Sequence, residues 1–166
     1  MKDNIILIGM PGVGKSTAGV VLAKAIGYDF IDADLVIQQK EGKLLSELIT
    51  EYGTDGFLAL ENRINRDIDT HKAVIATGGS AVYGKEAMAH YKEIGTVVYL
   101  AVSYEELERR LGDLKNRGVV MQQGQTLLDI YRERTALYER YADITVREEG
   151  LSIRETIETV RTELEI

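Results

Sequence analysis

Short apolar runs alternate along the chain with longer segments in which apolar and polar residues mix. The short runs are rich in β-branched residues, which is typical of buried strands, and they lie at 5–8, 28–32, 73–76, 96–100 and 144–146. The segments between them predict helices at 17–26, 35–39, 44–51, 55–70, 85–92 and 126–141, and two more that begin at Ser103 and Ser152. In the last helix we expect the apolar residues to be buried, namely Ile153, Ile157, Val160 and Leu164.

This alternation of strands and helices indicates the fold class. Strands that are joined through helices form a parallel sheet with both faces covered. We therefore predict an α/β protein, a three-layer α/β/α sandwich around a five-stranded parallel sheet, with residues 1–166 forming a single domain. Because right-handed crossovers bring the carboxyl ends of parallel strands to one edge, the loops after the strands should meet there and form the functional site.

The loop after the first strand carries the most specific motif. Gly9, Gly14, Lys15 and Ser16 fit G-x-x-x-x-G-K-[ST] between a strand and a helix, the context that a phosphate-binding loop (P-loop) requires. The glycines let backbone N–H groups face phosphate oxygens, Lys15 adds a positive charge, and the Ser16 hydroxyl suits Mg²⁺. We predict that a nucleoside triphosphate binds to the residues of this loop, namely Gly12, Val13, Gly14, Lys15, Ser16 and Thr17.

Two further strand ends carry candidate chemistry. Asp32 and Asp34 alternate on an extended segment and so point the same way. One carboxylate can orient Mg²⁺ through water while the other accepts a proton from an attacking hydroxyl, although either can also simply cap the next helix. Gly78 and Gly79 follow the next strand and let a substrate approach the backbone, unless they form an ordinary turn.

Two arginines are candidates for binding anions. Arg134 lies in the middle of an apolar and aromatic helix stripe, which runs through Leu127, Tyr131, Tyr138 and Tyr141. A buried arginine needs an anion or a route to water, so we expect a substrate carboxylate there, or else a structural ion pair or an extended side chain that reaches solvent. Arg117 lies in a polar, glycine-containing loop at 113–125, which we interpret as mobile. It could close over the triphosphate and stabilise the transferring phosphoryl group, or be a solvated charge.

Composition narrows the possible partners. The net charge of −7 argues against nucleic-acid binding, and no apolar run is long enough to span a membrane. The chain has no cysteine, and we see no signal peptide before the first strand. We expect a cytoplasmic monomer with a small-molecule substrate.

The motifs and their order resemble the shikimate kinase family over nearly the whole chain. The shared segments are Gly-Met-Pro-Gly-Val-Gly-Lys-Ser-Thr from Gly9, Phe-Ile-Asp-Ala-Asp from Phe30, Gly-Phe-x-x-x-Glu from Gly56, Thr-Gly-Gly-x-Ala-Val from Thr77, Val-Val-Tyr-Leu from Val97 and Arg-x-x-Leu-Tyr from Arg134. The resemblance implies a P-loop kinase of the nucleoside-monophosphate-kinase type, with a lid at 113–125 and a substrate-binding helical region at 34–61. It implies ATP- and Mg²⁺-dependent phosphorylation of the 3-hydroxyl of shikimate, a carboxylated cyclohexene triol, in aromatic amino acid biosynthesis.

The resemblance also implies roles for residues near the nucleotide. Lys15 would contact the phosphates and act in catalysis, Ser16 would ligate Mg²⁺, and Asp32 would hold a water molecule of the metal. Arg117 would be the catalytic arginine of the lid, and Arg110 would lie near the adenine.

Among the residues that would bind the substrate, most match the family and one departs from it. Asp34 would bind the substrate hydroxyls and assist deprotonation, Gly78 and Gly79 would contact the substrate, and Arg134 would bind its carboxylate. The family has an arginine after the phenylalanine of Gly-Phe, whereas this chain has Leu58, off the apolar stripe of its helix.

Losing one charge-assisted contact costs roughly 1.5–3 kcal/mol, or about 10- to 150-fold in affinity at about 1.4 kcal/mol per tenfold. Ser80 also replaces a glycine of the family, and no proline follows Arg117. Three hypotheses therefore stay open: a shikimate kinase, a kinase of another small hydroxy acid or polyol with Leu58 lining the pocket, and a nucleotide-binding module without phosphotransfer.

Overall fold

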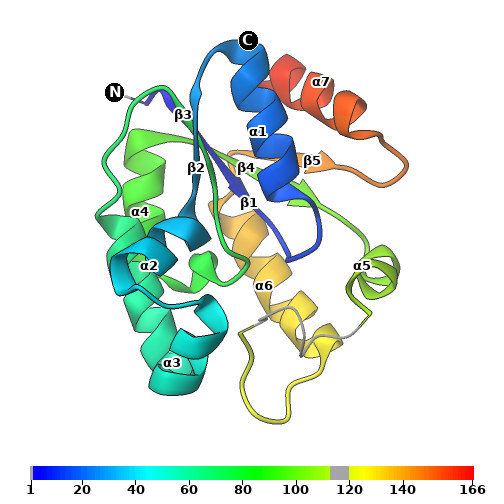
Figure 1. Ribbon diagram of the computed structural model, residues 1–166. Coiled ribbons are helices and arrows are strands. Elements are labelled where there is room, and N and C mark those ends of the chain that lie inside the picture. Colours follow the sequence, from blue (N-terminus) through cyan, green and yellow to red (C-terminus); the bar gives the residue numbers. More distant parts are fainter. Residues whose placement is uncertain (1, 113–119) are drawn as a thin grey trace.

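A five-stranded parallel sheet forms the centre of the molecule. The computed structural model describes residues 2–112 and 120–166. The strands are β1 (Asn4–Ile8), β2 (Asp29–Asp32), β3 (Ala73–Ala76), β4 (Gly95–Ala101) and β5 (Ile144–Arg147). They are arranged in the order β2-β3-β1-β4-β5 and all pair in parallel (Figure 1). The predicted α/β fold with five parallel strands is confirmed, and β1 is buried along its whole length between β3 and β4.

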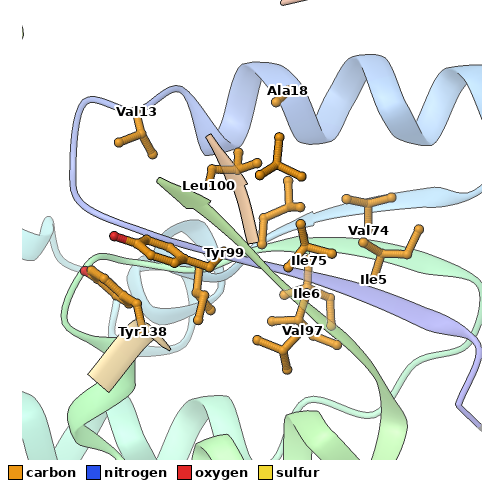
Figure 2. Close-up of a cluster of buried hydrophobic side chains, with 14 of the residues drawn as sticks. Ile5, Ile6, Val13, Ala18, Val74, Ile75, Val97, Tyr99, Leu100 and Tyr138 are labelled. Atoms are coloured by element: carbon orange, nitrogen blue, oxygen red, sulfur yellow. The ribbon is translucent and has the colours of Figure 1, made fainter. Parts of the chain in front are cut away.

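Helices cover both faces of this sheet. The α-helices are α1 (Lys15–Ile26), α2 (Ala33–Glu41), α3 (Leu45–Arg66), α4 (Lys85–Ile94), α5 (Tyr104–Leu111), α6 (Leu127–Tyr141) and α7 (Ile153–Leu164), and a short 3₁₀ helix, η1, spans Ala81–Tyr83. Figure 1 shows α1 and α7 together on one side of the sheet and α4 and α6 on the other. Figure 2 shows Val13 and Ala18 above the strands and Val97 and Tyr138 below them, so apolar side chains fill both interfaces.

The region between β2 and β3 differs in detail from the prediction. The helices predicted at 44–51 and 55–70 are one element, α3, with a break at Gly53, whose φ of 71° and ψ of 177° are not helical. The predicted end at residue 70 is wrong. The helix ends at Arg66, and the amides of Asp67 and Ile68 turn back to the carbonyls of Ile64 and Asn65.

A second, smaller apolar cluster lies between α2 and α3. Its buried members are Ile37, Leu48, Phe57, Leu60, Ile64 and Val120. Leu58 is half-buried and packs against this cluster, so it has a packing role that its place off the main stripe did not suggest.

The predicted burial of the last helix is partly wrong. Ile157 and Val160 are buried and Leu164 packs against the main core, but Ile153 is 50% exposed. Ile153 is the first residue of α7, in the first turn, where residues 152–155 are all exposed. Within residues 2–112 and 120–166, no helix combines the length and the apolar character that crossing a bilayer requires.

Candidate active site

The P-loop holds its lysine close to its own backbone. Gly14 has a φ of 84° and caps α1, which begins at Lys15, so the first amides of the helix open toward the loop. The side chain of Lys15 is buried, and its Nζ donates to the carbonyl oxygens of Gly9 at 2.7 Å and Met10 at 2.9 Å. Burial lowers the pKa of Lys15 to about 8, against the opposing charge of Asp34. A buried cation beside open helix amides is an environment suited to phosphate.

Ser16 and Asp32 present two oxygens to the same place. The Ser16 hydroxyl donates to Asp32 Oδ2 at 2.9 Å, while Asp32 Oδ1 accepts the amides of Asp34 and Leu35 and caps α2. Asp32 therefore caps the next helix, one of the two roles that the sequence left open, and its second oxygen faces the Ser16 hydroxyl. Hard oxygen donors fit Mg²⁺, which takes few ligands from a protein and keeps water and phosphate oxygens for the rest. In the described part of the chain no cluster of three or more histidine or acidic side chains could hold a metal ion by itself.

Asp34, which is half-buried, and Glu61, which is buried, are two carboxyl groups that approach Gly78. A β-carbon added at Gly78 would lie 2.6 Å from Asp34 Oδ1 and 2.9 Å from Glu61 Oε2, so both groups approach the same point. Burial, and then the charge of Asp32, raise the pKa of Asp34 to about 6, against the effect of Lys15. Glu61 is 2% exposed and accepts the Ser80 hydroxyl at 2.6 Å through Oε1. Burial raises its pKa to about 7, with Asp34 adding to the shift and Ser80 and Arg134 opposing it.

Arg134 is enclosed rather than extended to solvent. It is 1% exposed, its Nη2 donates to the carbonyl of Val120, and its guanidinium lies 5.4 Å from the centre of the Tyr83 ring. A β-carbon at Gly79 would lie 3.0 Å from Arg134 Nη1 and 2.7 Å from Pro11 Cδ. The absence of a side chain at Gly79 thus leaves room between the P-loop and the guanidinium. Tyr138, one turn further along α6, fixes this segment by donating to the carbonyl of Gly79 at 2.5 Å.

These groups share one cavity of about 350 Å³, called here the larger cavity. Its polar wall includes Lys15, Ser16, Thr17, Asp34, Glu61, Gly78, Gly79, Ser80 and Arg134. Leu45, Phe57 and Val120 form its apolar wall. Leu58 is not among its lining residues, whereas the other substrate-site candidates are.

A second cavity of about 300 Å³, the smaller cavity, lies on the other side of the P-loop. It shares Gly12, Gly14 and Thr17 with the larger one and is otherwise lined by residues that include Val13, Arg110, Glu148, Leu151 and Ile153. Arg110 forms ion pairs with Glu148 at 2.5 Å and Glu106 at 2.9 Å, which hold its guanidinium at this position. The two cavities therefore meet at the P-loop, with the predicted nucleotide residues between them.

Arg117 lies outside the described residues. Glu61 appeared in the sequence only as part of a motif and was given no role, although it shares the buried face of α3 with Phe57 and Leu60. An ionisable residue in an apolar stripe was the signal that identified Arg134, and the same signal applied to α3 identifies Glu61.

Comparison with known proteins gives a consistent result. A family model described as shikimate kinase matches residues 11–165. A shikimate kinase of Pasteurella multocida is 38% identical over 149 residues, which is 87% of this chain and 85% of that one. Another, of Thermodesulfovibrio yellowstonii, is 34% identical over 98% of this chain and 95% of its own length. The solved structure of a shikimate kinase from Acinetobacter baumannii in complex with shikimate superimposes with a TM-score of 0.88, at 30% identity, over 99% of this chain and 94% of that one.

Proposed function

Since this chain belongs to the shikimate kinase family, we propose that it transfers the terminal phosphoryl group of ATP to the 3-hydroxyl of shikimate. Family membership makes it a phosphotransferase that acts on a hydroxyl group. The observation that carries the proposal is the larger cavity, where Lys15 and Ser16 of the P-loop face Asp34, Gly79 and Arg134 across a space of about 350 Å³. That volume suits a small polyol acid beside a terminal phosphate.

The P-loop and the smaller cavity are the proposed nucleotide site. Residues 12–17 bind the phosphates, and the adenine lies in the smaller cavity beside Arg110, whose two ion pairs hold it in place. Ser16 and Asp32 hold Mg²⁺, which when bound neutralises the charge of the phosphates. By its resemblance to the lid arginine of the family, Arg117 stabilises the charge of the transferring phosphoryl group.

The far wall of the larger cavity is the proposed acceptor site. Arg134, whose guanidinium is buried and has no acidic partner among the described residues, binds the substrate carboxylate. Gly78 and Gly79 let the ring approach the backbone. Asp34 faces the hydroxyl to be phosphorylated, orients it and accepts its proton as the new P–O bond forms. A pKa of about 6 leaves Asp34 mostly ionised at neutral pH and therefore able to take that proton.

A second acceptor remains a candidate because of the charge in the larger cavity. Asp34 and Glu61 share that cavity with one arginine, Arg134, and with Lys15 of the P-loop. Leu58, which by the resemblance stands where the family has another arginine, packs against the apolar cluster. A neutral polyol would suffer less from that balance than shikimate, because it brings no carboxylate into the cavity. Comparing the KM values of shikimate and of neutral polyols, in wild type and in Leu58→Arg, separates the two. A marked fall in the shikimate KM of Leu58→Arg would show that the native site is weakened for this acid.

The decisive experiment measures ADP formation with shikimate, ATP and Mg²⁺ in wild type and in Asp34→Asn. We expect turnover in wild type and a loss of kcat of about 10²- to 10⁴-fold in the variant, the usual size of a general-base contribution. The control is Asp29→Asn, an exposed position at the other end of β2, which should keep full activity. Full turnover in Asp34→Asn would refute the base assignment. Nucleotide binding without turnover on any hydroxyl compound would instead indicate a binding module.

A further inference from the structure

Glu61 is a buried carboxyl group without a role in the proposed phosphoryl transfer. It lies on α3 and lines the larger cavity. Its Oε1 is occupied by the Ser80 hydroxyl at 2.6 Å, whereas Oε2 lies on the side of Gly78, next to Asp34. Within residues 2–112 and 120–166, no lysine, arginine or histidine forms an ion pair with it. A carboxyl group so placed has one oxygen free for a ligand and no cation of its own.

The groups that face Glu61 come from four other parts of the fold. Asp34 approaches from α2, Arg134 from α6, the Ser80 hydroxyl from the turn before η1, and the phenol of Tyr91 from α4. Only Arg134 is cationic, and it already donates to the Val120 carbonyl. Its favourable charge is outweighed by burial and by Asp34, which is why the pKa of Glu61 is raised.

The charge balance decides what can bind next to these groups. If Glu61 were ionised, two carboxylates would share the cavity with one guanidinium and with Lys15, whose Nζ is bonded to the P-loop carbonyls and whose charge the phosphates of the nucleotide would compensate. An anionic acceptor would then add a third negative charge to a buried space, where like charges repel strongly. If Glu61 is neutral, the acceptor meets one carboxylate and one guanidinium, and Oε2 becomes a hydrogen-bond donor.

We propose that Glu61 is a specificity-determining residue that binds the acceptor as a neutral carboxylic acid, so that a carboxylated acceptor enters the larger cavity together with one proton. The proton comes from solvent, resides on Oε2 and is donated in a hydrogen bond to an acceptor oxygen, and no covalent bond changes. In this way a neutral acid and one arginine do what two cationic side chains would otherwise do. The inference rests on the proposed function, because it takes shikimate as the carboxylated acceptor.

The first test needs only the wild-type protein. With saturating ATP, the KM for shikimate should rise about tenfold between pH 6 and pH 8, because each binding event must then protonate an ionised Glu61. Calorimetric titration of shikimate at pH 8, in buffers of different ionisation enthalpy, should show the uptake of nearly one proton, and almost none at pH 5.5. The neutral methyl ester of shikimate is the matched ligand, and its KM should change by less than about twofold over the same pH range.

Two variants assign the proton to Glu61. Glu61→Gln keeps an acceptor for Ser80 and an N–H donor toward the cavity but cannot titrate, so its shikimate KM should stay flat from pH 6 to pH 8. Ser80→Ala removes a hydrogen bond that lowers the pKa of Glu61, so the rise in KM should begin at a higher pH than in wild type. A purely structural role would instead shift KM by the same factor at every pH.

The outcomes separate this inference from the proposed function. Shikimate turnover with a flat KM and no proton uptake overturns the inference and leaves the function in place. Proton-linked binding of shikimate without turnover supports the inference and overturns the function. An unchanged pH dependence in Glu61→Gln overturns the assignment to Glu61, and a failure of shikimate to bind between pH 5.5 and pH 8 overturns both proposals.

Discussion

Arg134 and Glu61 are buried side chains that share the larger cavity, and their charges only partly compensate each other. Each forms a hydrogen bond with a neutral partner: Arg134 donates to the Val120 carbonyl, and Glu61 accepts the Ser80 hydroxyl. Burying a charge without a matched partner costs free energy, so such groups are expected at binding sites rather than in a core built for stability. The free-energy cost of burying such a group can therefore be measured as a difference in unfolding free energy between wild type and a variant that lacks the charge.

Replacing Glu61 by glutamine should stabilise the protein at alkaline pH. The pKa of Glu61 is about 7 in the folded chain and near its ordinary 4.5 in the unfolded one. As pH rises from 4.5 to 7 the unfolded chain loses this proton first, so folding stability falls, and the full cost is present above pH 7. The stability advantage of Glu61→Gln over wild type should therefore grow by roughly 2 kcal/mol between pH 5 and pH 8.

Urea unfolding at the two pH values measures this difference, and Glu163→Gln, at an exposed position of α7, is the control that should change little. An advantage that is the same at both pH values would mean that Glu61 is not protonated in the folded protein near neutrality.

Single residues could be predicted from the sequence as site candidates where they interrupted an apolar stripe or followed a strand. Arg134 was predicted because it interrupts an aromatic stripe, and Asp32 because it follows a strand beside the P-loop. Glu61 was not predicted as a separate feature, and the cluster against which Leu58 packs is completed by Val120, a residue more than 60 positions away. Local spacing cannot supply that contact.

The elements owe their ends to local chemistry, and most of these ends were predictable. Thr126 and Ser152 form full capping boxes with Asp129 and Glu155. At Ser103 only half of such a box is present, because Glu106 pairs with Arg109 and Arg110 instead of turning back to the Ser103 amide. The break in α3 has its cause in Gly53, whose positive φ an ordinary residue rarely adopts.

Thr126 is the cap of the helix that carries both Arg134 and Tyr138, so its loss should matter for stability. Its hydroxyl accepts the Asp129 amide at 3.1 Å. Thr126→Ala should destabilise the protein by about 1 kcal/mol, the usual cost of losing such a cap. The control is Thr162→Ala, an exposed position inside α7, where alanine favours the helix. Thermal unfolding of both variants checks this, and an equal or larger loss in Thr162→Ala would contradict it.

At the scale of the whole molecule, the apolar interior is divided between two clusters. The main cluster contains the sheet and the helices on its faces, while the smaller one lies between α2 and α3 beside the edge strand β2. The number of strands followed from their sequence pattern, but their order in the sheet did not, because it is set by pairings between distant segments such as β1 with β4. That order places β2 and α2, with Asp34, at the margin of the fold.

The two clusters predict which part of the molecule unfolds locally most often. The smaller cluster has few buried members and α3 is broken at Gly53, so the amides of residues 45–57 should exchange with solvent faster than those of β1 and β4. Leu45 and Phe57 line the larger cavity, whereas the residues of α3 take no part in lining the smaller one. Shikimate at about 100 times its Kd should therefore slow exchange in residues 45–57 by more than tenfold, since a ligand that binds only the closed form suppresses opening in proportion to its saturation.

ADP alone should protect residues 12–17 and leave 45–57 nearly unchanged, which makes the nucleotide the matched control for the acceptor. Hydrogen exchange followed by mass spectrometry resolves the two segments. If ADP protected 45–57 as strongly as shikimate does, the smaller cluster would respond to the P-loop and not to the acceptor. Contact of the acceptor with Leu45 and Phe57 would then not be what stabilises residues 45–57.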